Sequence, residues 1–329
     1  MYTLVLFSMV PQQMWLQVLI LVAGIAVVLE GADLLTKGAV GLAERMGIPQ
    51  IVIGLTIVAM GTSMPEFFVS LMSAINGTPD LAVGNVVGSN IFNALLIVGS
   101  AAVVAPITIL RATVRKDIPF ALVASAVLLM MCLDGNVNRL DALLLLALFL
   151  IFMTITLRGA RQDGVEQGEN KETGPANPPM HPLKAVALLT VGLAALILGS
   201  DVFVDNASAV ARTLGVSDAI IGLTIVACGT SMPELATSVV AASRGNSGIA
   251  IGNVLGSNVF NILLILGITG MVSPMVMQGI TQTDLSVMVV SMVLLWLFSF
   301  TKLRIERWEG AVLTLVFVGY MIYLIGYTV

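Results

Sequence analysis

Residues 53–99 read IGLTIVAMGTSMPEFFVSLMSAINGTPDLAVGNVVGSNIFNALLIVG, and residues 221–267 read IGLTIVACGTSMPELATSVVAASRGNSGIAIGNVLGSNVFNILLILG. The two stretches align without a gap at an offset of 168, and 29 of their 47 positions are identical. Self-similarity at a fixed offset is the signature of an internal repeat. The chain is therefore expected to fold as two related halves.

The composition around the repeat is that of a membrane protein. Hydrophobic residues make up 58% of the 329 residues and charged residues only 10%, against about 25% charged in a soluble domain. Apolar runs of about 20 residues, each long enough to cross about 30 Å of hydrocarbon, recur along the chain. The pattern predicts an all-α protein embedded in the lipid bilayer. Its ten expected spans are roughly 14–43, 50–76, 81–105, 117–134, 139–158, 183–211, 218–243, 249–272, 283–301 and 309–327.

One sizeable polar stretch, Arg158 to Pro182, divides the chain. It is rich in Gly, Pro, Glu, Asn and Gln, a composition typical of a flexible linker. We predict a first five-helix repeat over residues 1–158, a linker over 159–182 and a second five-helix repeat over 183–329.

The distribution of Lys and Arg predicts the orientation. With the amino terminus outside, the inner loops hold 12 basic residues and the outer loops two, Arg139 and Arg212. The protein is then expected in an inner or plasma membrane, with both termini on the outer side and the linker in the cytoplasm. Equivalent helices are five spans apart, and an odd number of spans reverses the direction of the chain. The two copies are therefore expected to cross the membrane in opposite directions. Inverted repeats recur in secondary transporters, which bind their substrate near the midplane between broken helices.

Glu66 and Glu234 fall near the middle of their spans, where a carboxylate is costly and usually marks an ion pathway. Each follows Gly-Thr-Ser-Met-Pro, and the proline breaks or kinks the helix. The carbonyl groups freed by the break need partners at a depth without water, and a bound cation is one such partner. Neutral oxygen ligands beside the breaks are expected from the hydroxyls of Thr62, Ser63, Thr230 and Ser231.

The same residues also fit a local structural motif. Ser63 to Glu66 and Ser231 to Glu234 both read as a capping box with a proline near the helix start. A capping box explains a glutamate at an exposed helix end, but it does not explain two in mid-membrane. We therefore expect the box to start a half-helix and the ion to lie at the break.

The second segment of the repeat carries Gly-Asn-x-x-Gly-Ser-Asn-x-Phe-Asn. In a helix the first Asn, the Ser and the last Asn share one face at steps of four. We predict that this face supplies ion ligands from Ser89, Asn93, Ser257 and Asn261.

The remaining residues of that segment have simpler interpretations. The pairs Gly84 with Gly88 and Gly252 with Gly256 predict close helix packing. Asn90 and Asn258 point away from the polar face and are expected to be structural.

Two carboxylates with amide, hydroxyl and carbonyl oxygens form a hard ligand set that suits Ca2+ and also Na+, but not soft transition metals. Two glutamates balance the charge of one Ca2+, whereas the empty pair repels itself and needs protons or Na+. Exchange follows from that requirement. With one histidine, His181, and two scattered cysteines, neither a zinc site nor a cofactor is expected. The sequence has no basic patch of the kind that binds nucleic acid, and nothing in it indicates an obligatory protein partner.

These motifs resemble those of the cation/calcium exchanger superfamily, and most closely its prokaryotic sodium/calcium exchanger branch. The resemblance covers the whole chain. It implies one Ca2+ position flanked by Na+ positions, with Glu66 and Glu234 as the central acidic ligands. It also implies that the backbone carbonyls of Ala59 and Ala227 bind flanking Na+, and that spans one and six slide over a fixed core.

One departure from the family concerns Asn93 and Asn261. Some members carry an aspartate at one of these positions, so this chain has one carboxylate fewer in its site. The residues leave open the ion stoichiometry and any use of protons or K+.

The function that these observations predict is a secondary antiporter that normally extrudes Ca2+ in exchange for Na+. The alternative is Ca2+/H+ exchange on the same scaffold, because desolvated glutamates can take up protons. An intramembrane hydrolase is disfavoured because no His or Lys lies near Ser63 or Ser231 in sequence to act as a base. The protein is therefore not expected to be an enzyme. A passive channel would be excluded by a saturable flux that requires a counter-ion.

Overall fold

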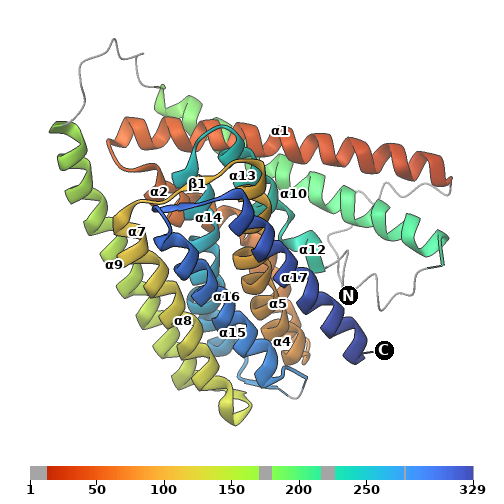
Figure 1. Cartoon of the computed structure of the whole chain (residues 1–329). Coiled ribbons are helices and arrows are strands. Elements are labelled where there is room, and N and C mark those ends of the chain that lie inside the picture. Colours follow the sequence, from red (N-terminus) through yellow and green to blue (C-terminus); the bar gives the residue numbers. More distant parts are fainter. Residues whose placement is uncertain (1–12, 170–179, 216–226, 278, 329) are drawn as a thin grey trace.

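The computed structural model describes residues 13–169, 180–215, 227–277 and 279–328 (Figure 1). In these residues eight helices are long and apolar enough to cross a membrane, and a bent helix pair makes a ninth candidate span. The chain is therefore a mostly helical membrane protein. The eight long helical stretches are α1 (Met14–Met46), α5–η2–α6 (Pro79–Val104), α7–α8–η3 (Arg111–Asp134), α9 (Arg139–Glu169), α10 (Pro182–Thr213), α14–η5–α15 (Ser247–Val272), α16 (Gln282–Phe300) and α17 (Arg307–Thr328).

Nine of the ten expected spans coincide with these candidates. The expected span at 218–243 lies partly outside the described residues, and its described part consists of α12 (Ala227–Thr230) and α13 (Met232–Ser243). The predicted linker differs at its start, because α9 continues to Glu169 instead of ending near Arg158. The Arg, Gln and Glu residues of this extension favour a helix, but its three glycines do not, so local propensity alone does not explain why the helix continues.

The bent span is broken where the proline motif predicts. It comprises α2 (Gln50–Ile53), the π-helix η1 (Gly54–Val58), α3 (Ala59–Thr62) and α4 (Met64–Ile75), and it bends by 47° at Ser63. Ser63 has φ −81° and ψ 9°, and Ser231 has nearly the same values, −90° and 8°. In both copies a proline lies within the first two positions of the following helix, where its missing N–H leaves no hydrogen bond unmade.

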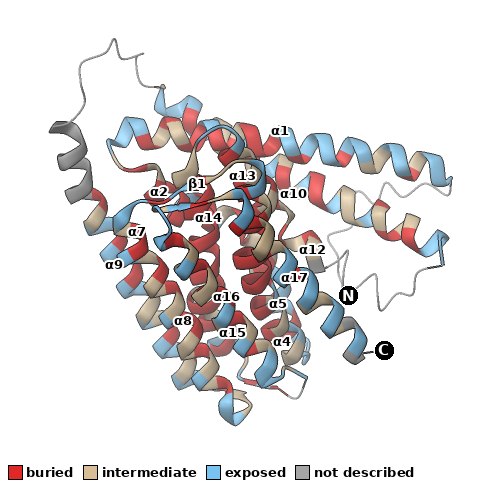
Figure 2. Ribbon diagram, viewed as in Figure 1, coloured by how far each residue is buried: buried red, intermediate tan, exposed pale blue. Residues whose placement is uncertain are grey.

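Two further helices change geometry inside the bundle. α5 (Pro79–Ile91) passes through the π-helix η2 (Phe92–Ile97) into α6 (Val98–Val104), and α14 (Ser247–Val259) passes through η5 (Phe260–Ile265) into α15 (Leu266–Val272). Short π segments inside α-helices are frequent at functional sites. In the most apolar 18 residues of Ser247–Val272, 94% of the residues are buried, against 22% in the corresponding part of α9. This stretch therefore forms the centre of the bundle (Figure 2).

Close packing holds α14 against the first copy of the repeat. A Cβ added to Gly256 would lie 2.6 Å from the Cβ of Ala59, and one added to Gly252 would lie 2.7 Å from the carbonyl of Ile51. The predicted packing role of this glycine pair is confirmed. By the offset of 168, most of the matching surface for Gly84 and Gly88 falls on residues 216–226, outside the described residues, so their role stays a prediction.

α1 and α10 pack against each other along most of their length and extend beyond the other helices (Figure 1). Their contact is made through glycines seven residues apart, Gly24, Gly31 and Gly38 on α1 and Gly192 and Gly199 on α10. A Cβ on Gly192 would lie 2.5 Å from the backbone nitrogen of Leu35. The absence of side chains at these positions lets the two backbones approach closely.

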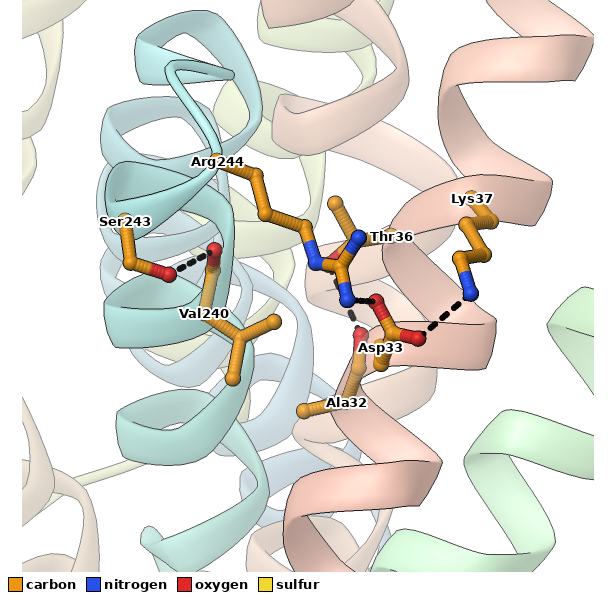
Figure 3. Close-up of polar contacts among 7 residues, drawn as sticks. All are labelled: Ala32, Asp33, Thr36, Lys37, Val240, Ser243 and Arg244. Atoms are coloured by element: carbon orange, nitrogen blue, oxygen red, sulfur yellow. Dashed lines mark hydrogen bonds and ion pairs between the residues drawn. The ribbon is translucent and has the colours of Figure 1, made fainter.

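An ion pair joins α1 to the end of α13. Asp33 on α1 bonds to Lys37 one turn later at 2.6 Å and also to Arg244 just after α13 (Figure 3). Asp33 and Lys37 are four residues apart, the spacing at which side chains on a helix face each other. The contact with Arg244 links segments that are 211 residues apart in the chain.

Two short strand pairs correct the expectation of an all-α fold. β1 (Ile107–Thr108) pairs antiparallel with β4 (Arg304–Ile305), and β2 (Asn136–Val137) pairs with β3 (Met275–Val276). Each pair ties a loop of the first half to a loop of the second. The two pairs are related by the offset of 168. Each strand has only two residues, too few for any periodic pattern to reveal it.

Candidate cation-binding site

The two glutamates of the repeat lie together at the helix breaks. Glu66 is in the first turn of α4 and Glu234 in the first turn of α13, and each is 1% exposed. A buried carboxylate is stable only when it is paired, hydrogen-bonded or neutralised. In both side chains Oε1 accepts a hydrogen bond, whereas Oε2 has no partner among the described residues.

The serine at each helix break donates a hydrogen bond to the glutamate of the other copy. Ser63 Oγ donates to Glu234 Oε1 at 2.9 Å, and Ser231 Oγ donates to Glu66 Oε1 at 3.0 Å. Neither serine caps its own helix, so the expected capping boxes are wrong. The physical reason is that each hydroxyl meets a buried carboxylate of the other copy, and a hydrogen bond to a charged acceptor is the stronger one.

The threonines beside the serines also face the opposite copy. Thr62 Oγ1 donates to Asn253 Oδ1 at 3.0 Å and lies 3.2 Å from the Val58 carbonyl. Thr230 ends α12, directly before Ser231. All four residues predicted from the repeat therefore lie at the helix breaks, and the role of their hydroxyls as ion ligands stays a prediction.

The facing helices bring up the other two predicted hydroxyls. Ser257 Oγ donates to Glu234 Oε1 at 3.3 Å. Ser89 Oγ lies 3.2 Å from Ser231 Oγ, next to the oxygen that bonds Glu66. Both serines are buried; Ser257 contacts Glu234 directly, whereas Ser89 reaches Glu66 through Ser231.

Asn93 and Asn261 occupy equivalent positions in η2 and η5 but have different partners. Asn93 Nδ2 donates to Asn258 Oδ1 at 3.0 Å, and its Oδ1 has no partner among the described residues. Both side-chain atoms of Asn261 lack a partner within the same part of the chain, although the residue is fully buried. Unpaired buried amide atoms are costly and are available to a ligand.

The two alanines predicted from the family lie beside the breaks. The Ala59 carbonyl accepts the backbone N–H of Ser63 at 3.0 Å and lies 3.4 Å from Thr62 Oγ1. Ala227 begins α12. Their role as carbonyl ligands stays a prediction.

The sequence patterns did not indicate what Asn85 and Asn253 contact. Asn85 Nδ2 donates to the Glu66 carbonyl at 3.2 Å and to Ser70 Oγ at 2.9 Å. Asn253 makes the matching contacts to the Glu234 carbonyl at 3.4 Å and to Ser238 Oγ at 3.1 Å. The identity of both the asparagine and the serine in the two copies was the signal that could have found them.

The site is thus a hard, all-oxygen set with two carboxylates. The described residues contain no group of three or more His, Cys, Asp or Glu that could hold a metal ion. Hydroxyl, amide and carboxylate oxygens in flexible geometry suit Ca2+ and do not suit soft metals. Cations bound at such a site would be transported substrates that enter and leave it.

A family model described as sodium/calcium exchanger protein matches residues 16–158 and 184–326. The chain belongs to the sodium/calcium exchanger family. The family transports Ca2+ and Na+ as an exchanger and is not a family of enzymes, which makes this chain a cation/calcium antiporter.

Relatives and solved structures agree with this membership. The chain is 36% identical over 302 residues to the putative antiporter CaxA of Alkalimonas amylolytica, covering 90% of this chain and 95% of that protein. It is 32% identical over 342 residues to the sodium/calcium exchanger MaX1 of Methanosarcina acetivorans, covering 93% and 97%. A structure of the sodium-calcium exchanger NCX_Mj soaked with zero Na+ and Ca2+ matches with a TM-score of 0.82 and 29% identity, covering 95% of this chain and all of that one.

Proposed function

We propose that this exchanger moves Ca2+ out of the cytoplasm in exchange for Na+ by alternating access. The observation that carries the proposal is the pair of buried glutamates, Glu66 and Glu234. In each, a serine of the other copy bonds one oxygen, and the other oxygen has no partner among the described residues. Two such carboxylates balance the charge of one Ca2+, and in its absence they need other cations to offset their repulsion.

We place the ions at the centre of the site. Glu66 and Glu234 bind Ca2+ directly through their free oxygens. The remaining ligands for Ca2+ and flanking Na+ come from Thr62, Ser63, Ser89, Asn93, Thr230, Ser231, Ser257 and Asn261, with the backbone carbonyls of Ala59 and Ala227. No resident cofactor is part of this proposal.

The architecture that we propose has ten spans in two inverted five-helix repeats, over 1–158 and 183–329. Supporting observations are the two matches of one family model, whose starts and ends are both offset by 168, and the equivalent strand pairs β1–β4 and β2–β3. In Figure 1 α4 lies near the lower end of the bundle and α13 near the upper end, as expected for opposed copies. The basic residues favour both termini outside and a cytoplasmic linker over 159–182.

The proposal is tested by radioactive Ca2+ uptake into proteoliposomes loaded with Na+, with Na+-free solution outside. Wild-type uptake is expected to require the Na+ gradient. Glu66→Gln and Glu234→Gln are each expected to reduce uptake at least about a hundredfold, because the neutral amide removes half of the charge that balances Ca2+. Glu44→Gln, which neutralises an exposed glutamate at the end of α1, is the matched control and should transport normally.

The competing function is Ca2+/H+ exchange, and the burial of both glutamates favours it. Protons can neutralise a buried pair of carboxylates as well as Na+ can. Uptake that ignores the Na+ gradient but follows a pH gradient would replace Na+ by H+ in the proposal. Uptake under neither gradient would overturn Ca2+ as the substrate.

A further inference from the structure

The helix that begins with each site glutamate is held by an asparagine from the facing helix. Asn85 on α5 donates to the main-chain carbonyl of Glu66 and to Ser70, and Asn253 on α14 does the same for Glu234 and Ser238. The same pair of contacts occurs twice in the chain. Neither asparagine touches the carboxylate oxygens through any contact that the described residues show.

These contacts fix the part of the helix that determines where the carboxylate points. Each glutamate follows a proline break, so its helix lacks the support of a preceding turn. One amide group bonds two points a full turn apart, the glutamate carbonyl and the serine hydroxyl, and so resists rotation of the half-helix about its axis. A ligand must be held within about 0.5 Å of its productive position for tight binding.

Asn253 has an additional partner in the other half of the molecule. Its Oδ1 accepts the hydroxyl of Thr62 at 3.0 Å, and its side chain is fully buried. Thr62 precedes Ser63, which donates to Glu234. Asn253 therefore touches both helix breaks, one through Thr62 and the other through Glu234.

We propose that Asn85 and Asn253 are positioning residues for the two cation-binding glutamates, and that Asn253 also couples the two half-sites through Thr62. The proposal rests on the cation exchange proposed above. Because Asn253 has a partner in each half, its loss affects Ca2+ binding more than the loss of Asn85.

Hydrogen bonds of this kind also serve simply to hold helices together. The two roles differ in what they change. A packing contact lowers the stability of the protein without altering its affinity for Ca2+. A positioning contact raises the Ca2+ concentration needed for half-maximal transport and changes the maximal rate much less, because the ligands are less well placed before the ion binds.

The experiment measures initial Ca2+ uptake as a function of Ca2+ concentration in Na+-loaded proteoliposomes. Asn253→Ala and Asn253→Leu both remove the amide, and the leucine keeps a similar volume. Asn90→Ala is the matched control, because Asn90 is a fully buried asparagine whose side-chain amide, in the part of the chain that the structure describes, bonds only to the Val86 carbonyl of its own helix. Thermal unfolding without Ca2+ measures the structural cost of each variant.

We expect the half-saturating Ca2+ concentration to rise about tenfold in both Asn253 variants, the loss expected for one buried hydrogen-bonding group. Asn85→Ala should raise it by a smaller factor, and Asn90→Ala should leave it unchanged. An unshifted value in the Asn253 variants, with only a lower unfolding temperature, overturns the positioning role. Recovery by leucine would also overturn it, because volume alone would then be sufficient.

The outcome separates this inference from the proposed function. Wild-type transport with unshifted Asn253 variants removes the positioning role alone. Absence of Ca2+ transport by the wild type under both a Na+ and a pH gradient removes the proposed function and the positioning role with it.

Discussion

The two copies of the repeat are nearly identical in sequence around the site, yet their surroundings differ. Asn93 in the first copy bonds to Asn258, but the equivalent bond from Asn261 to Asn90 is not made, and atoms of both residues are left without partners among the described residues. The alternating access proposed above needs the two halves to adopt different conformations in each state, and unequal contacts around equivalent residues fit that need.

The copies also differ away from the site. Asp33 on α1 has two cationic partners, Lys37 and Arg244. At the offset of 168, the acid at the matching position is Asp201 on α10, while Lys37 is replaced by Asp205 and Arg244 corresponds to Asn76. Neither Asp201 nor Asp205 has an ion pair within the described part of the chain. One end of the α1–α10 pair is therefore tied to the bundle by charge where its counterpart is not.

The largest difference in Ca2+ uptake is expected between two variants that each add a carboxylate to one copy, at Asn93 or at Asn261. Asn93→Asp removes the donor to Asn258 and sets a negative charge against its oxygen, so Ca2+ uptake should fall at least about tenfold. Asn261→Asp breaks no contact among the described residues and adds a negatively charged oxygen ligand, so uptake should persist with a lower half-saturating Ca2+ concentration. Equal losses in proteoliposome uptake would show that the difference between the copies does not matter for transport.

A smaller effect is expected from the asparagines outside the polar face. Asn258→Ala leaves Asn93 without its acceptor in the core, and should destabilise the protein by about 2 kcal/mol. Among the described residues, the Asn90 side chain makes one bond, to Val86 in its own helix, so Asn90→Ala should cost less than about 1 kcal/mol. Thermal unfolding in detergent without Ca2+ compares them, and the reverse order would contradict the asymmetry seen here.

The smallest effect is expected at the outer charges. Asp33→Asn removes the anion shared by Lys37 and Arg244, and should destabilise the protein by about 1 kcal/mol because both cations are half-exposed and screened. Asp201→Asn removes no ion pair and should be neutral or slightly stabilising, since Asp205 lies one turn away. Unfolding at low and high salt gives the check: only the loss at Asp33 should shrink with salt.

Much of the architecture follows from local properties of the chain. Spans are visible because about 20 apolar residues are needed to cross the hydrocarbon, and nine of the expected ten coincide with candidate spans. The break at Ser63 follows from Pro65 and its missing N–H. The burial of Glu66 and Glu234 beside the breaks could be expected from their mid-span positions. Their role as ion ligands, expected because a carboxylate in mid-membrane is costly, stays a prediction.

The partners of each side chain could not be predicted in the same way. Ser63 and Ser231 fit a capping box by spacing, but each bonds a glutamate of the other copy. The choice depends on a helix that is more than 160 residues away in the chain. The two-residue strands were missed for the related reason that their pairing lies entirely between the halves.

The sequence by itself determined the membrane class, the twofold repeat, the helix breaks and the residue types of the site, because hydrophobic length, proline geometry and the cost of buried charge act within one segment. Only the tertiary structure decided that the hydroxyls cross between the copies, that Asn253 joins both breaks, and that the two halves are unequal. Those features depend on which surfaces meet, and two segments with nearly the same sequence differ there because their neighbours differ.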